Sequence, residues 1–139
     1  MFLLDTNVVS EIRKIKGGKA DPNVARWVEA LDPGSAFVSV ITLRELEIGV
    51  MRAERRDPTQ GALLRLWLET MAIPAFGGRI LPVDIVVAKR AAKLPIPNPH
   101  PINYAFIAAT ALVHGMTVVT RNISDFEATG ARVFNPWDA

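Results

Sequence analysis

The chain has 139 residues, of which 50% are hydrophobic and 22% charged, a composition typical of one globular domain with its own core. The absence of cysteine excludes disulfides and thiolate metal sites, and two histidines are too few to favour a zinc site. The formal net charge of +2 permits a polyanionic partner without requiring one. With no apolar run of membrane-spanning length and no charged segment before the N-terminal apolar stretch, we expect a cytoplasmic protein that does not enter a membrane.

The first eleven residues predict a buried strand that turns directly into a helix. Phe2–Leu4 is a short apolar run, and Thr6-Asn7 is typical of a helix start. Asp5 would then lie at the carboxyl end of a strand, where α/β folds place their ligands. Because Asp is also a favoured helix N-cap, position alone leaves a structural and a functional role equally open.

The rest of the chain alternates between helical and strand patterns. We expect helices at 6–16, from Pro22 to about Leu31, from Thr42 onward, from about Thr59 to an end or kink before Pro74, at 83–94, at 103–114 with Asn103 as N-cap, and near 124–129. Strands are expected at 1–5, 36–41, 79–81, 117–120 and 132–134, with an extended proline-rich loop at 95–101. This alternation predicts an α/β fold whose mostly parallel sheet is covered on both faces, in a single domain over residues 1–139.

Basic residues gather in three groups along the chain. Each group is compatible with a solvated helix face or a C-terminal helix turn, and the three together favour nucleic acid weakly. The groups are Lys14, Lys16 and Lys19; Arg52, Arg55 and Arg56; and Lys89, Arg90 and Lys93.

Carboxylates and an amide follow the predicted strands. Asp5 follows the first strand, Glu45 lies one helical turn after the second, and Asn122 and Asp125 follow the strand at 117–120. The carboxyl ends of parallel strands open on one edge of a sheet, so these side chains can meet. Oxygen ligands suit Mg²⁺ or Mn²⁺, which activates water for phosphodiester cleavage.

Each of these carboxylates also has a structural interpretation. Thr42 and Glu45 have the spacing of a capping box, and Asp125 lies at the start of a short helix, where an acidic side chain favours the helix dipole. Asp84 lies in the first turn of the helix at 83–94, and we interpret it as structural. Spacing alone therefore leaves a carboxylate metal site as one of two open interpretations.

Five segments, taken in order and spacing, resemble the PIN-domain ribonucleases, and more narrowly the VapC and FitB toxins of type II toxin–antitoxin pairs. They are LLDTNVVSE at 3–11, SVITLRELEIGV at 39–50, GRILPVD at 78–84, FIAATALVHGMTVVTRNISDFE at 106–127 and VFNPW at 133–137. The resemblance covers essentially the whole chain. It implies an α/β/α sandwich around a short, mostly parallel sheet, and an endoribonuclease that cleaves structured RNA, such as transfer RNA, with water activated by Mg²⁺ or Mn²⁺. It also implies a homodimer, a VapB-like antitoxin partner, and contact with operator DNA only through that antitoxin.

By this resemblance, Asp5 and Glu45 are metal-binding carboxylates, Asn122 holds the fourth position of the site, and Asp125 is a further metal ligand. The third position, normally an Asp, is Tyr104. A phenol stays protonated at neutral pH, with a pKa of about 10, and is a poor Mg²⁺ ligand. We therefore expect catalysis to be impaired in this chain.

Other interpretations stay open beside this one. Tyr104 can pack with Ile107, Ala108 and Ala111, which share its helical face. A catalytically dead chain would act as an antitoxin-binding and dimerisation module in DNA-bound autorepression. An aspartyl-phosphate phosphatase is disfavoured, because that chemistry calls for a second carboxylate where position 7 is Asn.

Overall fold

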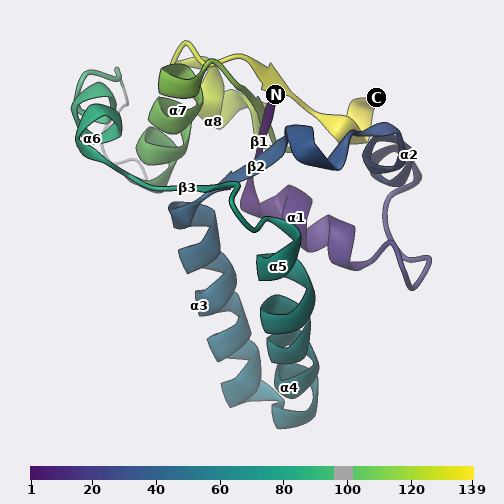
Figure 1. Ribbon diagram of the computed structural model, residues 1–139. Coiled ribbons are helices and arrows are strands. Elements are labelled where there is room, and N and C mark those ends of the chain that lie inside the picture. The colour runs from purple at the N-terminus through teal and green to yellow at the C-terminus, as the bar shows by residue number, and fades with distance from the viewer. Residues whose placement is uncertain (96–101) are drawn as a thin grey trace.

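The computed structural model describes residues 1–95 and 102–139, which form a parallel sheet flanked by helices (Figure 1). The strands are β1 (Phe2–Leu4), β2 (Ala36–Ser39), β3 (Ile80–Leu81), β4 (Thr117–Val119) and β5 (Val133–Phe134). Their spatial order is β3-β2-β1-β4-β5, and every neighbouring pair is parallel. The central strand β1 places Leu3 opposite Phe37 on β2 and Val118 on β4. The predicted α/β class with a parallel sheet is confirmed.

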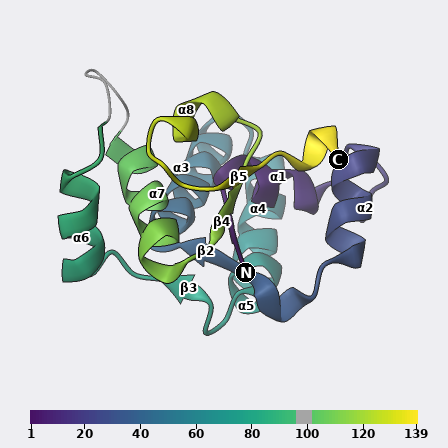
Figure 2. The same cartoon turned by 90° about the horizontal axis from the view of Figure 1, so that it is seen from above.

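Helices cover both faces of this sheet. They are α1 (Thr6–Arg13), α2 (Pro22–Ala30), α3 (Val40–Arg56), α4 (Pro58–Trp67), α5 (Ile73–Ala75), α6 (Ile85–Ala92), α7 (Ile102–His114) and α8 (Ile123–Glu127), with short turns η1 (Pro33–Ser35) and η3 (Pro136–Asp138) and a π-helical segment η2 (Leu68–Ala72). Figure 2 shows α6 and α7 to one side of the strands and α2 to the opposite side. Of the helices in the described ranges, none is long and apolar enough to cross a membrane.

Two layers of the core lie on opposite faces of the strands because successive strand residues alternate in direction. Leu3 and Val118 pack with α7 and α8, whereas Leu4 and Val119 pack with Val8 of α1. Burial on both faces explains why the strands are mostly apolar rather than alternating. Each such side chain contributes about 1.5–3 kcal/mol to folding.

The second strand ends earlier than the sequence predicted. Ser39 is the N-cap of α3 and its Oγ accepts a hydrogen bond from the Ile41 N–H at 3.0 Å. The predicted capping box of Thr42 and Glu45 is therefore wrong, because Thr42 lies inside α3, where it is buried. This leaves the Glu45 side chain to find a partner outside its own helix.

Other helix boundaries also differ from the prediction. Helix α1 ends at Arg13 rather than residue 16, because a turn carries the chain to Gly18, whose φ of +70° suits glycine. Helix α6 spans only Ile85–Ala92, and Asp84 caps it by accepting from the Val87 N–H at 2.9 Å, which confirms the structural role of Asp84.

The last departures concern proline and Asn103. Helical structure continues through Pro74 to Ala75. Proline has no backbone N–H to donate, and the π-helical segment η2 changes the hydrogen-bond register of the helix directly before it. Asn103 lies inside α7, which already includes Ile102, so its predicted N-cap role is wrong. The loop expected at 95–101 lies outside the described residues, apart from Pro95.

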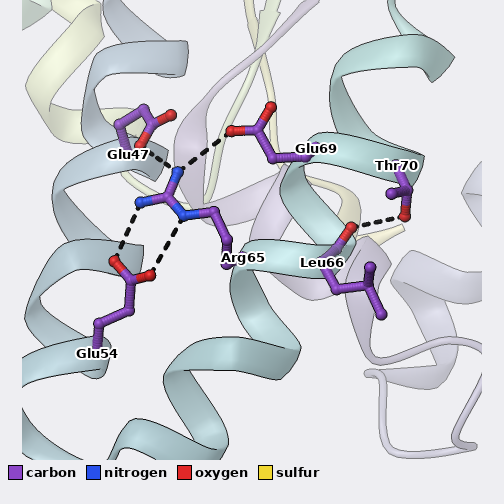
Figure 3. A network of polar contacts seen from close by, with 6 residues as sticks. All are labelled: Glu47, Glu54, Arg65, Leu66, Glu69 and Thr70. Carbon is purple, nitrogen blue, oxygen red and sulfur yellow. Dashed lines mark hydrogen bonds and ion pairs between the residues drawn. The ribbon is translucent and has the colours of Figure 1, made fainter.

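Helices α3 and α4 form a hairpin that extends away from the sheet (Figure 1). Arg65 of α4 joins its two arms: its guanidinium contacts Glu47 at 2.7 Å and Glu54 at 3.1 Å on α3, and Glu69 at 3.2 Å (Figure 3). The two helices approach closely at Gly61, since a Cβ there would lie 2.4 Å from the Glu54 Cα. The ion pairs are partly exposed and individually weak, so the close approach at Gly61 is the stronger constraint.

Substituting Gly61→Ala should lower the free energy of unfolding by about 2 kcal/mol or more, because the added methyl group overlaps the backbone of α3. Gly49 of α3 is the matched control: a Cβ there meets nothing within 4 Å. Gly49→Ala should instead raise stability by about 0.5–1 kcal/mol, through helix propensity. Urea unfolding of the two variants measures both effects, and equal stabilities would contradict the close packing at Gly61.

Candidate active site

The predicted site residues converge at the carboxyl ends of the central strands. Asp5 follows β1, and its Oδ2 accepts from the Thr120 hydroxyl, which follows β4, at 2.8 Å. Glu45 on α3 accepts from the Thr6 hydroxyl at 2.6 Å. Because all the strands are parallel, residues separated by more than a hundred positions meet at this edge.

Asp5 is both a helix cap and a member of this cluster. Its Oδ1 accepts the Thr6 N–H at 2.8 Å as N-cap of α1, and Asn7 Nδ2 donates to its Oδ2 at 3.4 Å. The side chain is only 4% exposed. Burial raises the pKa of the Asp5 carboxyl; the hydrogen bonds from Thr120 and Thr6 oppose this, and the charges of Glu45 and Asp125 add to it.

Tyr104 makes two kinds of contact at this edge of the sheet, one through its ring and one through its hydroxyl. Its ring is half-buried and packs edge-on against Phe126, with ring centroids 5.1 Å apart. It lies against the cluster that contains Ile107, Ala108 and Ala111, so the predicted packing is confirmed. Its hydroxyl forms hydrogen bonds with Asp125 and Asn122.

The phenol of Tyr104 is held in its neutral form. Burial raises its pKa above the ordinary value, and the negative charges of Asp125 and Asp5 act in the same direction. Tyr104 therefore brings a neutral hydroxyl, rather than a carboxylate, into the cluster.

Asn122 and Asp125 approach from α8. Asn122 is exposed and makes no side-chain capping bond, although its N–H donates to the Thr120 hydroxyl at 3.0 Å. Asp125 is half-buried in the first turn of α8, and its N–H donates to the Asn122 carbonyl at 3.2 Å. The side chains of both residues are in reach of the Tyr104 hydroxyl.

Three residues of this cluster were missed by the sequence reasoning. Thr6 and Thr120 donate to Glu45 and Asp5, and Asn7 bridges Asp5, Thr120 and the N–H of Arg121. The signal available was their position: each lies within three residues of a strand end that carries a predicted site residue. Hydroxyl and amide donors at such positions can satisfy carboxylates that face no cation.

The residues as they stand do not fit a hard divalent cation. Both oxygens of Asp5 and one of Glu45 accept protein hydrogen bonds, which orient the two carboxylates; these bonds do not by themselves exclude a cation, because a carboxylate offers about four lone-pair sites. Position 104, where the family resemblance leads us to expect a carboxylate, holds a phenol, a poor ligand for Mg²⁺ at neutral pH. Within residues 1–95 and 102–139, no group of three or more His, Asp or Glu side chains is placed to hold a metal ion. The metal-ligand roles of Asp5, Glu45 and Asp125 stay predictions.

Comparison with known proteins gives one consistent result. The PIN-domain profile matches residues 2–131. A protein named VapC ribonuclease Y4jK, from Sinorhizobium fredii, is 37% identical over 99% of both chains, and Toxin FitB from Neisseria gonorrhoeae is also 37% identical over 99% of both chains. The structure of FitAB bound to an IR36 DNA fragment contains a chain with a TM-score of 0.87 and 34% identity, over 99% of this chain and 96% of that one.

Replacing Asp5 by Asn tests how much the ionised Asp5 carboxylate destabilises the folded protein. The raised pKa means that the folded protein holds the Asp5 proton more tightly than the unfolded chain, so native stability falls as pH rises from about 4 through the folded-state pKa. Asp5→Asn removes this loss and should raise the free energy of unfolding at pH 7.5. Urea unfolding from pH 4 to 8 should show the gain shrinking at low pH. A gain that does not change with pH, or a loss at pH 7.5, would contradict the assignment.

Proposed function

The chain belongs to the PIN-domain family, among the VapC and FitB toxins, and on this premise we propose that it is the toxin of a type II toxin–antitoxin pair whose endoribonuclease site is impaired by Tyr104. The observation that supports this most strongly is the position of Tyr104. Its hydroxyl lies among Asp5, Asn122 and Asp125, where the family resemblance calls for an Asp.

The proposed reaction is hydrolysis of a phosphodiester bond in structured RNA, with transfer RNA as the expected class. Asp5 and Glu45 are the proposed carboxylates of the site, and Thr120 and Thr6 fix their orientation through the hydrogen bonds at 2.8 and 2.6 Å. Mg²⁺ or Mn²⁺ is the proposed cofactor of a form that carries Asp at position 104. In the present chain, the Tyr104 hydroxyl bonds Asp125 instead.

The proposed partners follow from the same premise. We propose a VapB-like antitoxin, a homodimeric toxin, and contact with operator DNA only through the antitoxin. The likeness to the FitAB structure, which is bound to DNA and matches almost the full length of this chain, supports an assembly of this kind.

A second function is favoured by the same residue. If Tyr104 abolishes turnover completely, the chain acts as an antitoxin-binding and dimerisation module in DNA-bound autorepression. The packing of Tyr104 on Phe126 favours this, because the substitution is accommodated without exposing the ring. The two functions differ in whether restoring a carboxylate restores cleavage.

Tyr104→Asp should raise Mg²⁺-dependent cleavage of a structured RNA by at least about a hundredfold, because it returns a carboxylate to the site. Tyr104→Phe is the matched control: it removes the same hydroxyl but adds no carboxylate, and should stay as inactive as the parent chain. Cleavage is followed on end-labelled RNA with Mg²⁺ and with EDTA. Equal cleavage by the parent and Tyr104→Asp would show that Tyr104 does not impair the site. A folded Tyr104→Asp form that cuts no RNA would favour the binding module.

A further inference from the structure

Three cavities adjoin one another along α1 and α3. One of about 480 Å³ lies beside Glu45, a second of about 260 Å³ shares Thr6, Glu45 and Gly49 with it, and a third of about 520 Å³ shares Arg13 with the second. We call this row of three cavities the α1–α3 groove. It starts at a proposed carboxylate of the active site and ends at the turn after α1.

Basic side chains line both ends of the groove. Arg44 and Arg52 line the cavity beside Glu45, and the far cavity is lined by Arg13, Lys14 and Lys19. Glu45 is the one acidic residue that lines any of the three cavities in the described part of the chain. The two end cavities therefore have a positive lining, one of them next to a carboxylate. The cavity between them is lined mainly by apolar side chains, which include Leu64 and Trp67.

Most of these cations are free to contact a ligand. Lys14 pairs with Glu11 at 3.1 Å. Among residues 1–95 and 102–139, no ion pair holds Arg13, Lys19, Arg44 or Arg52. Arg65, by contrast, is engaged by three glutamates. These four side chains line the groove, and none of the ion pairs among the described residues uses them to hold helices together.

Gly49 supplies an independent observation at the junction of the first two cavities. It lies in the interior of α3 and is exposed, and a Cβ there would meet nothing within 4 Å. A glycine inside a helix costs about 1 kcal/mol relative to alanine, and packing gives no reason for it here, in contrast to Gly61. An open backbone at the floor of a groove allows a ligand to approach closely.

We propose that the α1–α3 groove binds the sugar–phosphate backbone of a single-stranded RNA segment and leads it to the Glu45 end of the site. Arg44 and Arg52 lie eight residues apart on α3, which is about 12 Å along the helix axis, and they contact separate phosphates. Arg13 and Lys19 contact the backbone at the far end. The inference rests on the proposed function and adds to it the path of the substrate.

The groove also distinguishes among the basic groups of the sequence. Arg52, Lys14 and Lys19 line it, whereas Lys89 and Arg90 lie on α6 and do not. Phosphate contacts of this kind position the strand and carry no sequence information. The groove thus contributes affinity and register, and other groups select the target.

The test measures RNA binding by the parent chain, whose Tyr104 keeps cleavage low, using fluorescence anisotropy of a labelled single-stranded RNA oligonucleotide over a range of salt concentrations. Replacing Arg44 and Arg52 together by Gln should weaken binding at least about tenfold. It should also reduce the salt slope by about 1.4, at about 0.7 for each lost phosphate contact on a single strand. The control, in which Lys89 and Arg90 are both replaced by Gln, removes the same charge and should change neither quantity by more than twofold. Gly49→Gln, which changes no charge, should weaken binding by filling the groove.

The outcomes separate this inference from the proposed function. Equal losses in the Arg44/Arg52 and Lys89/Arg90 variants would overturn it, because binding would then depend on net charge alone. It is likewise overturned if the parent binds no RNA, or if the groove variants keep RNA affinity and lose an antitoxin instead. If Tyr104→Asp fails to cleave RNA while the groove variants still weaken binding, the proposed cleavage fails and the RNA path stands.

Discussion

A buried carboxylate at the end of the central strand is the constraint on which the rest of the site depends. Asp5 is 4% exposed and lies near Glu45 and Asp125, so its ionised form is disfavoured both by desolvation and by like charge. Its donors, Thr6, Asn7 and Thr120, compensate in part. They come from the start of α1 and from the end of β4, so satisfying this carboxylate ties the first helix to the neighbouring strand.

Tyr104 limits the negative charge of this cluster. An aspartate at position 104 would add another negative charge to a group that already raises the pKa of Asp5. The phenol adds none, donates its hydrogen to a nearby acceptor, and buries its ring against Phe126. A tyrosine at position 104 therefore adds no further negative charge to the buried cluster, whereas an aspartate there would raise the electrostatic cost of folding.

Most of the fold and the convergence of the site could be predicted from the sequence. The apolar runs at Phe2–Leu4 and Thr117–Val119 predict buried strands, and parallel pairing of these strands brings the residues that follow them together. The role of Glu45 could not be predicted from spacing, because Thr42 and Glu45 match a capping box while Ser39, three residues earlier, caps the helix in fact. Asp5 bonds Thr120, and Tyr104 contacts Asn122 and Asp125, all across long stretches of sequence. Such contacts could not be predicted from the residue pattern within one helix or strand.

We propose that the Tyr104 phenol, rather than any defect of the fold, prevents the site from binding a divalent cation. Calorimetric titration with Mn²⁺ of the parent chain and the Tyr104→Asp form tests it most directly, because it needs neither the RNA target nor the antitoxin. The claim predicts saturable Mn²⁺ binding by Tyr104→Asp and none by the parent at millimolar concentration. Equal Mn²⁺ binding by the two forms would contradict it.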